Sequence, residues 1–197
     1  MNKELNERIT DALVKDGYII IPHAMRNSLP SQLLTKAKET TNYKKASISR
    51  ATNKQIDSDK RRDSICWLDH DNAEQSEFLN FADEFKEYLN RELFMGIQYF
   101  ESHFAIYEEG DFYETHIDAF KDSKNRVVTV VYYLNENWVD GDGGELVVYD
   151  SQNQHLTTVA PHADTLVVFL SDKFPHEVLK ANKRRYSIAG WFRVDKR

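Results

Sequence analysis

The fold class is decided by a run of β-branched and aromatic residues, RVVTVVYYL at positions 126–134. Residues of these types favour a buried, pleated strand. Further runs of the same kind follow or precede it at 98–107, 145–149, 155–159, 165–170 and 185–193. Turn-forming residues separate the runs, as in DGDGG at 140–144 and SQN at 151–153. Many short strands at close spacing predict an antiparallel sandwich or barrel.

The chain before position 97 has a different period, because its apolar residues recur at helical spacing. Helices are predicted over three segments, 2–16, 29–40 and 74–93. A short buried strand is predicted between the first two helices, at 18–21. The third helix carries a stripe of aromatic residues, which is more often a packing face than a cofactor site.

The segment 41–62 is polar and basic. It contains seven Lys or Arg residues, against Asp57 and Asp59 as its only acidic residues. We therefore expect a long exposed loop, and loops of this length in compact domains are usually functional or disordered. Because the whole chain carries a net charge of −6, this segment would form a basic flap on an acidic body.

Helices followed by closely spaced strands predict an α+β fold. The length of 197 residues favours one domain, 1–197. Within it, residues 1–96 would supply helical support and a loop, and residues 97–193 the β core. The helices would cover the outer face of that core.

Composition excludes several classes of protein. Hydrophobic residues make up 41% and charged residues 29% of the chain, which is typical of a globular protein. No apolar run is long enough to span a membrane, and no secretory signal is present at the start. The single cysteine, Cys66, excludes a disulfide framework and cysteine-ligated metals, and it indicates a reducing, cytoplasmic location. The negative charge argues against nucleic acid as the main partner.

The motif His116-Ile117-Asp118 suggests a metal site. In an extended segment, residues i and i+2 point to the same face, so both side chains can reach one ion. His176, at the start of a late strand, is the best candidate for a third ligand. Two histidines and one carboxylate form the facial triad that suits non-haem Fe(II). A single histidine on a strand is more often structural, so the motif needs further support.

That support comes from Arg185, which follows His176 by nine residues. On a strand, Arg185, Ser187, Ala189 and Trp191 share one face. If this face is the interior, the guanidinium needs an anion. A dicarboxylate such as 2-oxoglutarate would supply it, and Fe(II), one aspartate, the dianion and the arginine sum to no net charge. The alternative is that Arg185 is a surface charge on an edge strand.

The ordered set of motifs resembles the prolyl hydroxylase branch of the Fe(II)/2-oxoglutarate dioxygenases, in particular the SM-20/EGL-nine type and its bacterial relatives. The matching positions span residues 98–193 and comprise Tyr107, Gly110, Tyr113, His116, Asp118, Arg126, Thr129, Tyr133, Leu134, Asn135, Gly143–Leu146, Pro161, Phe169, Pro175–Val178, Arg185 and Trp191. The resemblance implies a double-stranded β-helix, or jelly roll, with the metal at its mouth. It also implies Fe(II), 2-oxoglutarate and O2 as cofactor and co-substrates, with ascorbate as a further ligand.

The resemblance assigns roles by position. His116, Asp118 and His176 would bind iron, and Arg185 would be the catalytic residue that pairs with the C5 carboxylate of 2-oxoglutarate. The remaining co-substrate contacts would come from Tyr107, Thr129, Tyr133, Leu146 and Trp191. Plain strand packing is the alternative for the tyrosines.

Upstream, Arg62-Asp63 resembles the entry to the mobile substrate loop of this family. Asp63 would pair with Arg126, the alternative being a solvated pair worth little.

The leading function is hydroxylation of a prolyl residue in an exposed loop of a cytosolic protein, with release of succinate and CO2. The basic segment 41–62 would favour a partner of acidic character, and the resemblance suggests elongation factor Tu as that partner. Oxidation of a free amino acid, a small metabolite or another residue is the alternative within enzymes. From a different class, the chain could be a catalytically silent jelly-roll module that binds a metal or ligand. A zinc hydrolase is disfavoured because the sequence contains no HExxH motif.

Overall fold

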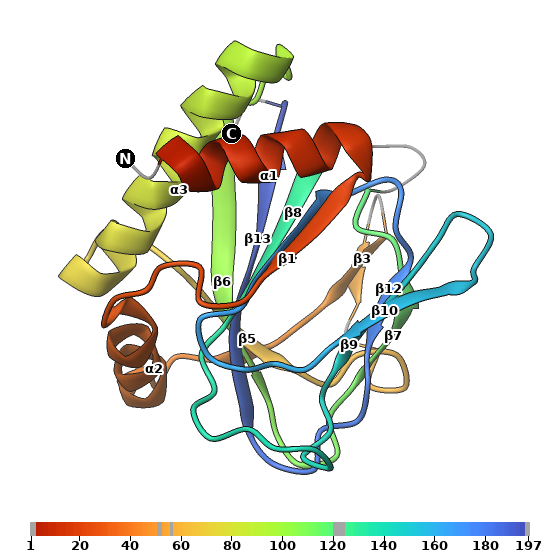
Figure 1. Ribbon diagram of the computed structural model, residues 1–197. Coiled ribbons are helices and arrows are strands. Elements are labelled where there is room, and N and C mark those ends of the chain that lie inside the picture. Colours follow the sequence, from red (N-terminus) through yellow and green to blue (C-terminus); the bar gives the residue numbers. More distant parts are fainter. Residues whose placement is uncertain (1–2, 51–52, 56, 120–124, 196–197) are drawn as a thin grey trace.

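The computed structural model describes residues 3–50, 53–55, 57–119 and 125–195, and most of its strands form two antiparallel sheets (Figure 1). The larger sheet comprises β1 (Tyr18–Ile21), β2 (Lys44–Lys45), β5 (Ser64–Trp67), β6 (Tyr99–Tyr107), β8 (Arg126–Tyr133), β11 (Leu166–Leu170) and β13 (Arg185–Arg193). The smaller sheet comprises β7 (Tyr113–His116), β9 (Leu146–Tyr149), β10 (His155–Val159) and β12 (His176–Val178). Their orders are β1-β11-β8-β13-β6-β5-β2 and β10-β9-β12-β7. The two sheets form the predicted α+β jelly roll.

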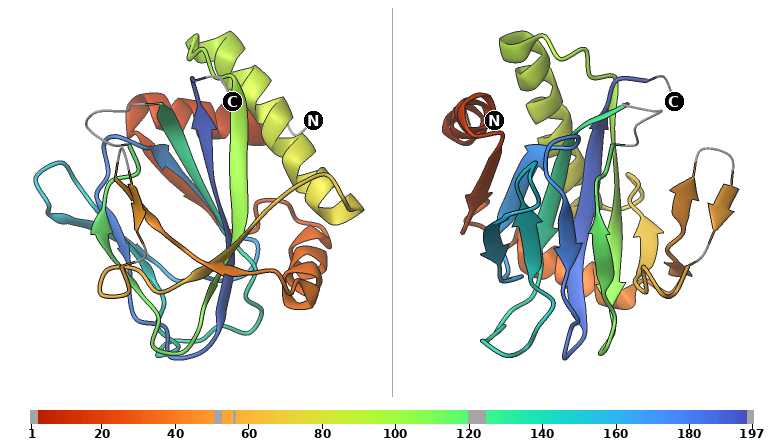
Figure 2. Two further views of the ribbon diagram at one scale, coloured as in Figure 1. Left: turned by 180° about the vertical axis from the view of Figure 1, so that it is seen from behind. Right: turned by 90° about the vertical axis from the view of Figure 1, so that its right-hand side faces the viewer.

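The interior between the sheets is built by alternation along the strands. In β8, Val131 and Tyr133 face the smaller sheet, and Val128, Val130 and Tyr132 face the other way. The inner residues pack against side chains of the smaller sheet such as Leu146, Val148 and Val178. The outer residues are nevertheless buried, because helices cover that side (Figure 2). A strand buried on both faces explains why its sequence reads as one continuous apolar run.

The covering helices are α1 (Lys3–Lys15), α2 (Leu29–Glu39) and α3 (Ala73–Leu93). Each has one apolar face, and α1 buries Leu5, Ile9 and Leu13. The longest helix, α3, begins where the Asn72 side chain accepts a hydrogen bond from the Gln75 amide at 3.0 Å, which satisfies one of the free donors of the first turn. Among the described helices, none combines the length and apolar character that crossing a membrane requires.

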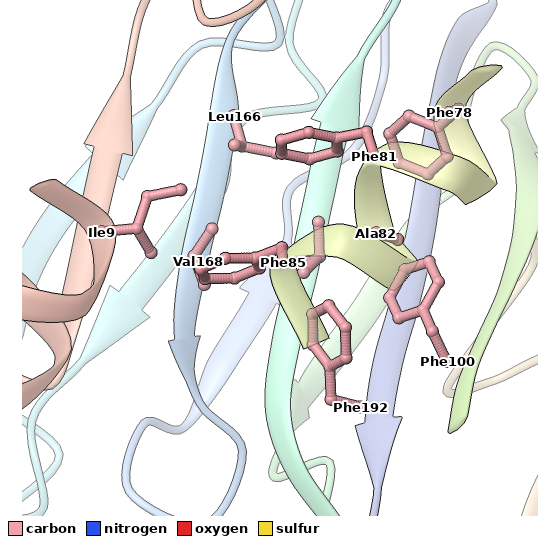
Figure 3. A pocket seen from close by; sticks show the side chains of 10 residues that line it. Ile9, Phe78, Phe81, Ala82, Phe85, Phe100, Leu166, Val168 and Phe192 are labelled. Atoms are coloured by element: carbon pink, nitrogen blue, oxygen red, sulfur yellow. The ribbon is translucent and has the colours of Figure 1, made fainter. Parts of the chain in front are cut away.

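Aromatic side chains fill the space between α3 and the larger sheet (Figure 3). Phe78 stacks on Tyr132 with ring centroids 5.6 Å apart, and Phe85 meets Phe192 edge-on at the same distance. Only a small void of about 10 Å³ remains there, and all the side chains that line it are hydrophobic. The predicted aromatic stripe is therefore a packing face, and it offers no polar group to a ligand.

The segment 41–62 differs from the predicted loop, because it contains short strands. β2 pairs with β5, and β3 (Ile48–Arg50) pairs with β4 (Asn53–Gln55) in a separate hairpin. The prediction failed because these strands lack apolar alternation, and lysines are common on exposed edge strands. Of the basic residues predicted here, the side chains of Arg50 and Lys54 lie outside what the structure describes.

The end of this segment joins the smaller sheet beside β7. The Arg62 amide donates to the Phe112 carbonyl at 3.1 Å, and the Glu114 amide donates to the Lys60 carbonyl at 2.8 Å. Residues 60–62 therefore run antiparallel to β7, which leads directly to His116. We call residues 41–62 the flap.

Candidate metal centre and co-substrate pocket

His116, Asp118 and His176 converge at one end of the smaller sheet. His116 ends β7 and His176 begins β12, and the two residues are direct partners in the antiparallel register. Asp118 lies in the turn beyond β7 rather than on the strand, so it reaches the same point after the chain has left the sheet. One ligand atom from each residue lies within 4.8 Å of the others. Asp118 and His176 are buried, and His116 is partly exposed.

Backbone carbonyls orient both imidazole rings. Nδ1 of His116 is 2.8 Å from the Glu114 carbonyl, and Nδ1 of His176 is 3.0 Å from the Phe174 carbonyl. Because a carbonyl only accepts, each Nδ1 carries a proton and donates it, so in the neutral ring Nε2 is the atom that holds the lone pair. The two Nε2 atoms lie 3.7 and 3.6 Å from the Asp118 carboxylate. Three donor atoms without protons thus face one position.

The electrostatics favour a divalent cation there. Burial, followed by the neighbouring His176, lowers the pKa of His116 to about 3. Burial opposes ionisation of Asp118, but His176 and His116 together hold its pKa at about 2. At neutral pH the site therefore presents a neutral His116 imidazole beside an ionised Asp118 carboxylate. This nitrogen and oxygen donor set fits non-haem Fe(II) and leaves open coordination positions.

A buried arginine closes the other end of the site. Arg185 is 1% exposed, and its Nη1 donates to the Ser187 hydroxyl at 3.1 Å. Its guanidinium lies over the rings of Tyr107 and Tyr133, at 4.8 and 5.0 Å from their centroids. Among the described residues, no carboxylate pairs with Arg185, and its Nε and the Tyr133 hydroxyl have no hydrogen-bond partner of good geometry. A buried cation without an anion fits a bound dicarboxylate.

Space for the arginine depends on a glycine. Gly144 has a φ of +68°, and a Cβ there would lie 2.9 Å from Cδ of Arg185. Any larger residue would therefore be strained in its backbone and would push the guanidinium aside. The Gly143-Gly144 pair in the sequence thus serves the buried arginine.

The metal triad and Arg185 line one pocket of about 70 Å³. The other predicted site residues that line it are Asp63, Tyr107, Arg126, Thr129, Leu146 and Trp191. Tyr133 lies beneath the Arg185 guanidinium. The predicted face of β13 is present, since Arg185, Ser187, Ala189 and Trp191 all line the pocket. Arg62 is not part of it, because that side chain is exposed and lies over Phe112.

The predicted pair of Asp63 with Arg126 is wrong. Asp63 accepts two hydrogen bonds from Arg61, at 2.5 and 2.8 Å, and the pair is buried rather than solvated. The bonds to Asp63 outweigh burial and raise the pKa of Arg61. Arg126 instead donates to Glu101 at 3.0 Å and lies 3.8 Å from the ring centroid of Trp191. Arg61 precedes Asp63 by two residues, so the same-face rule for extended chain could have found the pair.

Sequence reasoning also missed His103, which lines the pocket and is 1% exposed. Its ring meets Trp67 and Trp191 at centroid distances of 5.2 and 5.5 Å. Burial, with a contribution from Arg61, lowers its pKa to about 4. The available signal was its position, because His103 lies an even number of residues before Tyr107 on β6 and so shares its face.

The fold and the site together define a class: a jelly-roll protein with two histidines and one carboxylate at a single metal position. Comparison with known proteins agrees with that class. Residues 102–193 match the family model of the 2OG-Fe(II) oxygenase superfamily. A Pseudomonas putida prolyl-4-hydroxylase structure is 33% identical, with a TM-score of 0.86 over 97% of this chain and 100% of that one. The chain belongs to the 2OG-Fe(II) oxygenase superfamily, in its prolyl hydroxylase branch.

Two further relatives extend the likeness. A Trichoplax adhaerens prolyl hydroxylase, solved with a hypoxia inducible factor peptide fragment, is 28% identical with a TM-score of 0.84, over 98% of this chain and 90% of that one. The Caenorhabditis elegans hypoxia-inducible factor prolyl hydroxylase is 40% identical over 92 residues, 45% of this chain. That match spans only 12% of the nematode protein, and the match to rat Egl nine homolog 1 spans 25% of it.

Proposed function

We propose that this protein is an Fe(II)- and 2-oxoglutarate-dependent dioxygenase that hydroxylates a prolyl residue of a cytoplasmic protein and releases succinate and CO2. The observation that carries the proposal is a buried Arg185 without a carboxylate partner among the described residues, in the same pocket as His116, Asp118 and His176. A metal-binding module alone has no use for that arginine. Two structural relatives named as prolyl hydroxylases support the choice of target.

In this proposal Fe(II) is held by Nε2 of His116, a carboxylate oxygen of Asp118 and Nε2 of His176. The bound metal would supply the oxidising chemistry that replaces an unactivated C–H bond with C–OH, coupled to oxidative decarboxylation of 2-oxoglutarate. The carbonyls of Glu114 and Phe174 hold both imidazoles as the Nδ1–H tautomer. The protein therefore supplies a fixed donor set before the metal arrives.

Arg185 binds the distal carboxylate of 2-oxoglutarate through its free guanidinium edge, and the Tyr133 hydroxyl donates to the same group. Among the described residues, Nε of Arg185 and the Tyr133 hydroxyl are buried without a hydrogen-bond partner of good geometry, so a bound anion would offset the free-energy cost of burying them. Tyr107, Leu146 and Val178 form apolar walls around this end of the pocket. They exclude water from the region between the anion and the metal triad.

The target proline enters from the side of the pocket where Trp191, His103 and Arg61 lie. Aromatic rings suit a proline ring, and the cations of the flap favour an acidic segment in the partner. A protein with an exposed proline loop is therefore the proposed substrate, and elongation factor Tu is one candidate to include in the test. Ascorbate belongs to the proposal as the reductant that keeps iron in the Fe(II) state.

The test has two stages. Anaerobic addition of Fe(II) and then 2-oxoglutarate to the full chain should produce a weak visible charge-transfer absorption that His116→Ala abolishes. Partners captured by the Asp118→Ala protein from cells are then compared by mass spectrometry with the same proteins from wild-type cells. A gain of one oxygen on proline supports the proposal. Oxidation of a free amino acid or another residue would replace the prolyl target, and binding without any turnover would indicate a silent module.

A further inference from the structure

Two buried hydroxyls lie in line behind the Asp118 carboxylate. The Thr129 hydroxyl donates to Oδ2 of Asp118 at 2.8 Å, and the Ser171 hydroxyl lies 2.9 Å from the Thr129 oxygen. Thr129 is 1% exposed and Ser171 is 0% exposed. Thr129 lines the pocket, whereas Ser171 does not. The chain of hydroxyls therefore runs from the pocket wall into the protein interior.

The direction of these hydrogen bonds follows from counting protons. The ionised carboxylate of Asp118 can only accept, so the single hydroxyl proton of Thr129 is committed to it. Ser171 must then be the donor to the Thr129 oxygen. Hydrogen bonds in such a chain polarise one another in the same direction, which strengthens the last bond to the carboxylate.

Backbone bonds hold Ser171 in place. Its amide donates to the Val127 carbonyl at 3.1 Å, and its own carbonyl accepts from the Ala119 amide at 3.2 Å. The second bond ties Ser171 to the residue that follows Asp118. Ser171 therefore fixes both the backbone beside the carboxylate and, through Thr129, the carboxylate itself. Thr129 is anchored on β8, opposite Phe169 of β11.

We propose that Thr129 and Ser171 are positioning residues that hold the Asp118 carboxylate in the orientation needed for metal binding. This inference rests on the proposed metal site and adds to it two residues that do not touch the metal position themselves. Oδ2 is held by Thr129 while it lies 3.6 Å from Nε2 of His176, and Oδ1 lies 3.7 Å from Nε2 of His116. Rotation of the carboxylate would break the Thr129 bond, so the hydroxyl chain keeps it facing both histidines.

The test measures metal affinity rather than turnover. Mn(II) is titrated calorimetrically into the full chain in the absence of 2-oxoglutarate, for the wild type and for Thr129→Val, which keeps the shape and removes the hydroxyl. Loss of such an outer hydrogen bond typically weakens metal binding by about 10- to 100-fold. Thr129→Ser retains the donor and should restore affinity to within a few-fold of the wild type.

Ser171→Ala is the decisive variant, because Ser171 reaches Asp118 only through Thr129 and a backbone bond that alanine preserves. We expect weaker Mn(II) binding than in the wild type, and no additional loss when Ser171→Ala is combined with Thr129→Val, since the two act in series. Ser102→Ala is the matched control: its hydroxyl is equally buried, has no partner among the described residues and lies outside the pocket.

The Tm of each metal-free variant shows whether the substitution disturbs the fold itself or only the orientation of the Asp118 carboxylate. The positioning role is overturned if Ser171→Ala binds Mn(II) as tightly as the wild type and Ser102→Ala do. It is also overturned if the loss of Mn(II) affinity in the double variant equals the product of the two single losses. If Thr129→Val fails to fold, the comparison of Ser171→Ala with Ser102→Ala still decides. Absence of Mn(II) binding by the wild type would instead contradict the proposed metal site, and so the two failures are distinguishable.

Discussion

Tyr113 lies against His116, with ring centroids 3.6 Å apart and planes that differ by 16°. The guanidinium carbon of Arg61 is 4.5 Å from the centroid of the Tyr113 ring, and Asp63 holds that guanidinium. The base of the flap is thus in contact with a proposed metal ligand through one aromatic ring. Displacement of the flap by a partner would be transmitted to His116 by these contacts.

Removal of the Arg61 cation should strongly destabilise the protein. The Asp63 side chain is 0% exposed and Arg61 is its partner, so Arg61→Met leaves a buried carboxylate unpaired. Breaking such a pair costs about 3–5 kcal/mol, to be measured by urea unfolding at pH 7. Arg62→Met is the control. Arg62 is exposed, so this variant should have nearly the same free energy of unfolding as the wild type. Equal stability of the two variants would contradict the buried pair.

Arg185→Met should weaken binding of 2-oxoglutarate without changing affinity for Mn(II). Charge-assisted hydrogen bonds contribute about 1.5–3 kcal/mol each, so we expect the Kd for 2-oxoglutarate to rise by about 100-fold in calorimetry. Arg184→Met provides a neighbouring control, since Arg184 is exposed and pairs with Glu108 at 2.8 Å. Comparable effects of the two substitutions would rule out Arg185 as the anion site.

His103 should make the fold sensitive to acid. Its pKa is lowered to about 4 in the folded protein, against about 6.5 for an unperturbed histidine. Between these values the unfolded chain binds a proton that the folded protein does not, so stability falls as pH drops from about 6.5 to 4 and levels off below. The loss amounts to about 3 kcal/mol.

The His103 contribution is measured as the pH dependence of the unfolding free energy, compared between the wild type and His103→Gln. The variant should have a shallower slope over this range. His70→Gln is the control, because His70 is exposed and should leave the slope unchanged. A wild-type slope in His103→Gln would show that the imidazole is not buried in neutral form.

Metal binding should stabilise the fold. A ligand that binds only the folded state adds about 2.7 kcal/mol at 100 times its Kd, so Mn(II) should raise the Tm. The rise should be abolished in His116→Ala but retained in His155→Ala, which changes an exposed histidine of β10. Removal of the metal with a chelator should return the wild-type Tm to its starting value.

Phe78 should be among the most important residues for stability. It is 0% exposed and packs between α3 and the larger sheet, so Phe78→Ala should cost about 3–5 kcal/mol. Phe94 is 88% exposed, and Phe94→Ala should change the unfolding free energy by less than about 0.5 kcal/mol. A small effect at Phe78 would mean that the helices contribute little to the core.

The strands of the core could be predicted because the β-branched and aromatic residues of β8, β11 and β13 leave no competing helical pattern. The convergence of His116 with Asp118 was predicted from strand geometry, although Asp118 lies in the turn beyond the strand. The partner of Asp63 was mispredicted, although the spacing of two residues between Arg61 and Asp63 in extended chain could have revealed the pair. Ser171 was missed because its proposed role depends on a neighbour 42 positions away in sequence.

The order of the larger sheet has a consequence for biosynthesis. β13 lies between β8 and β6, yet it is translated after all other strands described here. Until residues 185–193 leave the ribosome, β6 and β8 each expose an unpaired edge, and the helices lack part of the surface on which they pack. The nascent chain is therefore incomplete, and vulnerable to aggregation, until β13 enters the sheet.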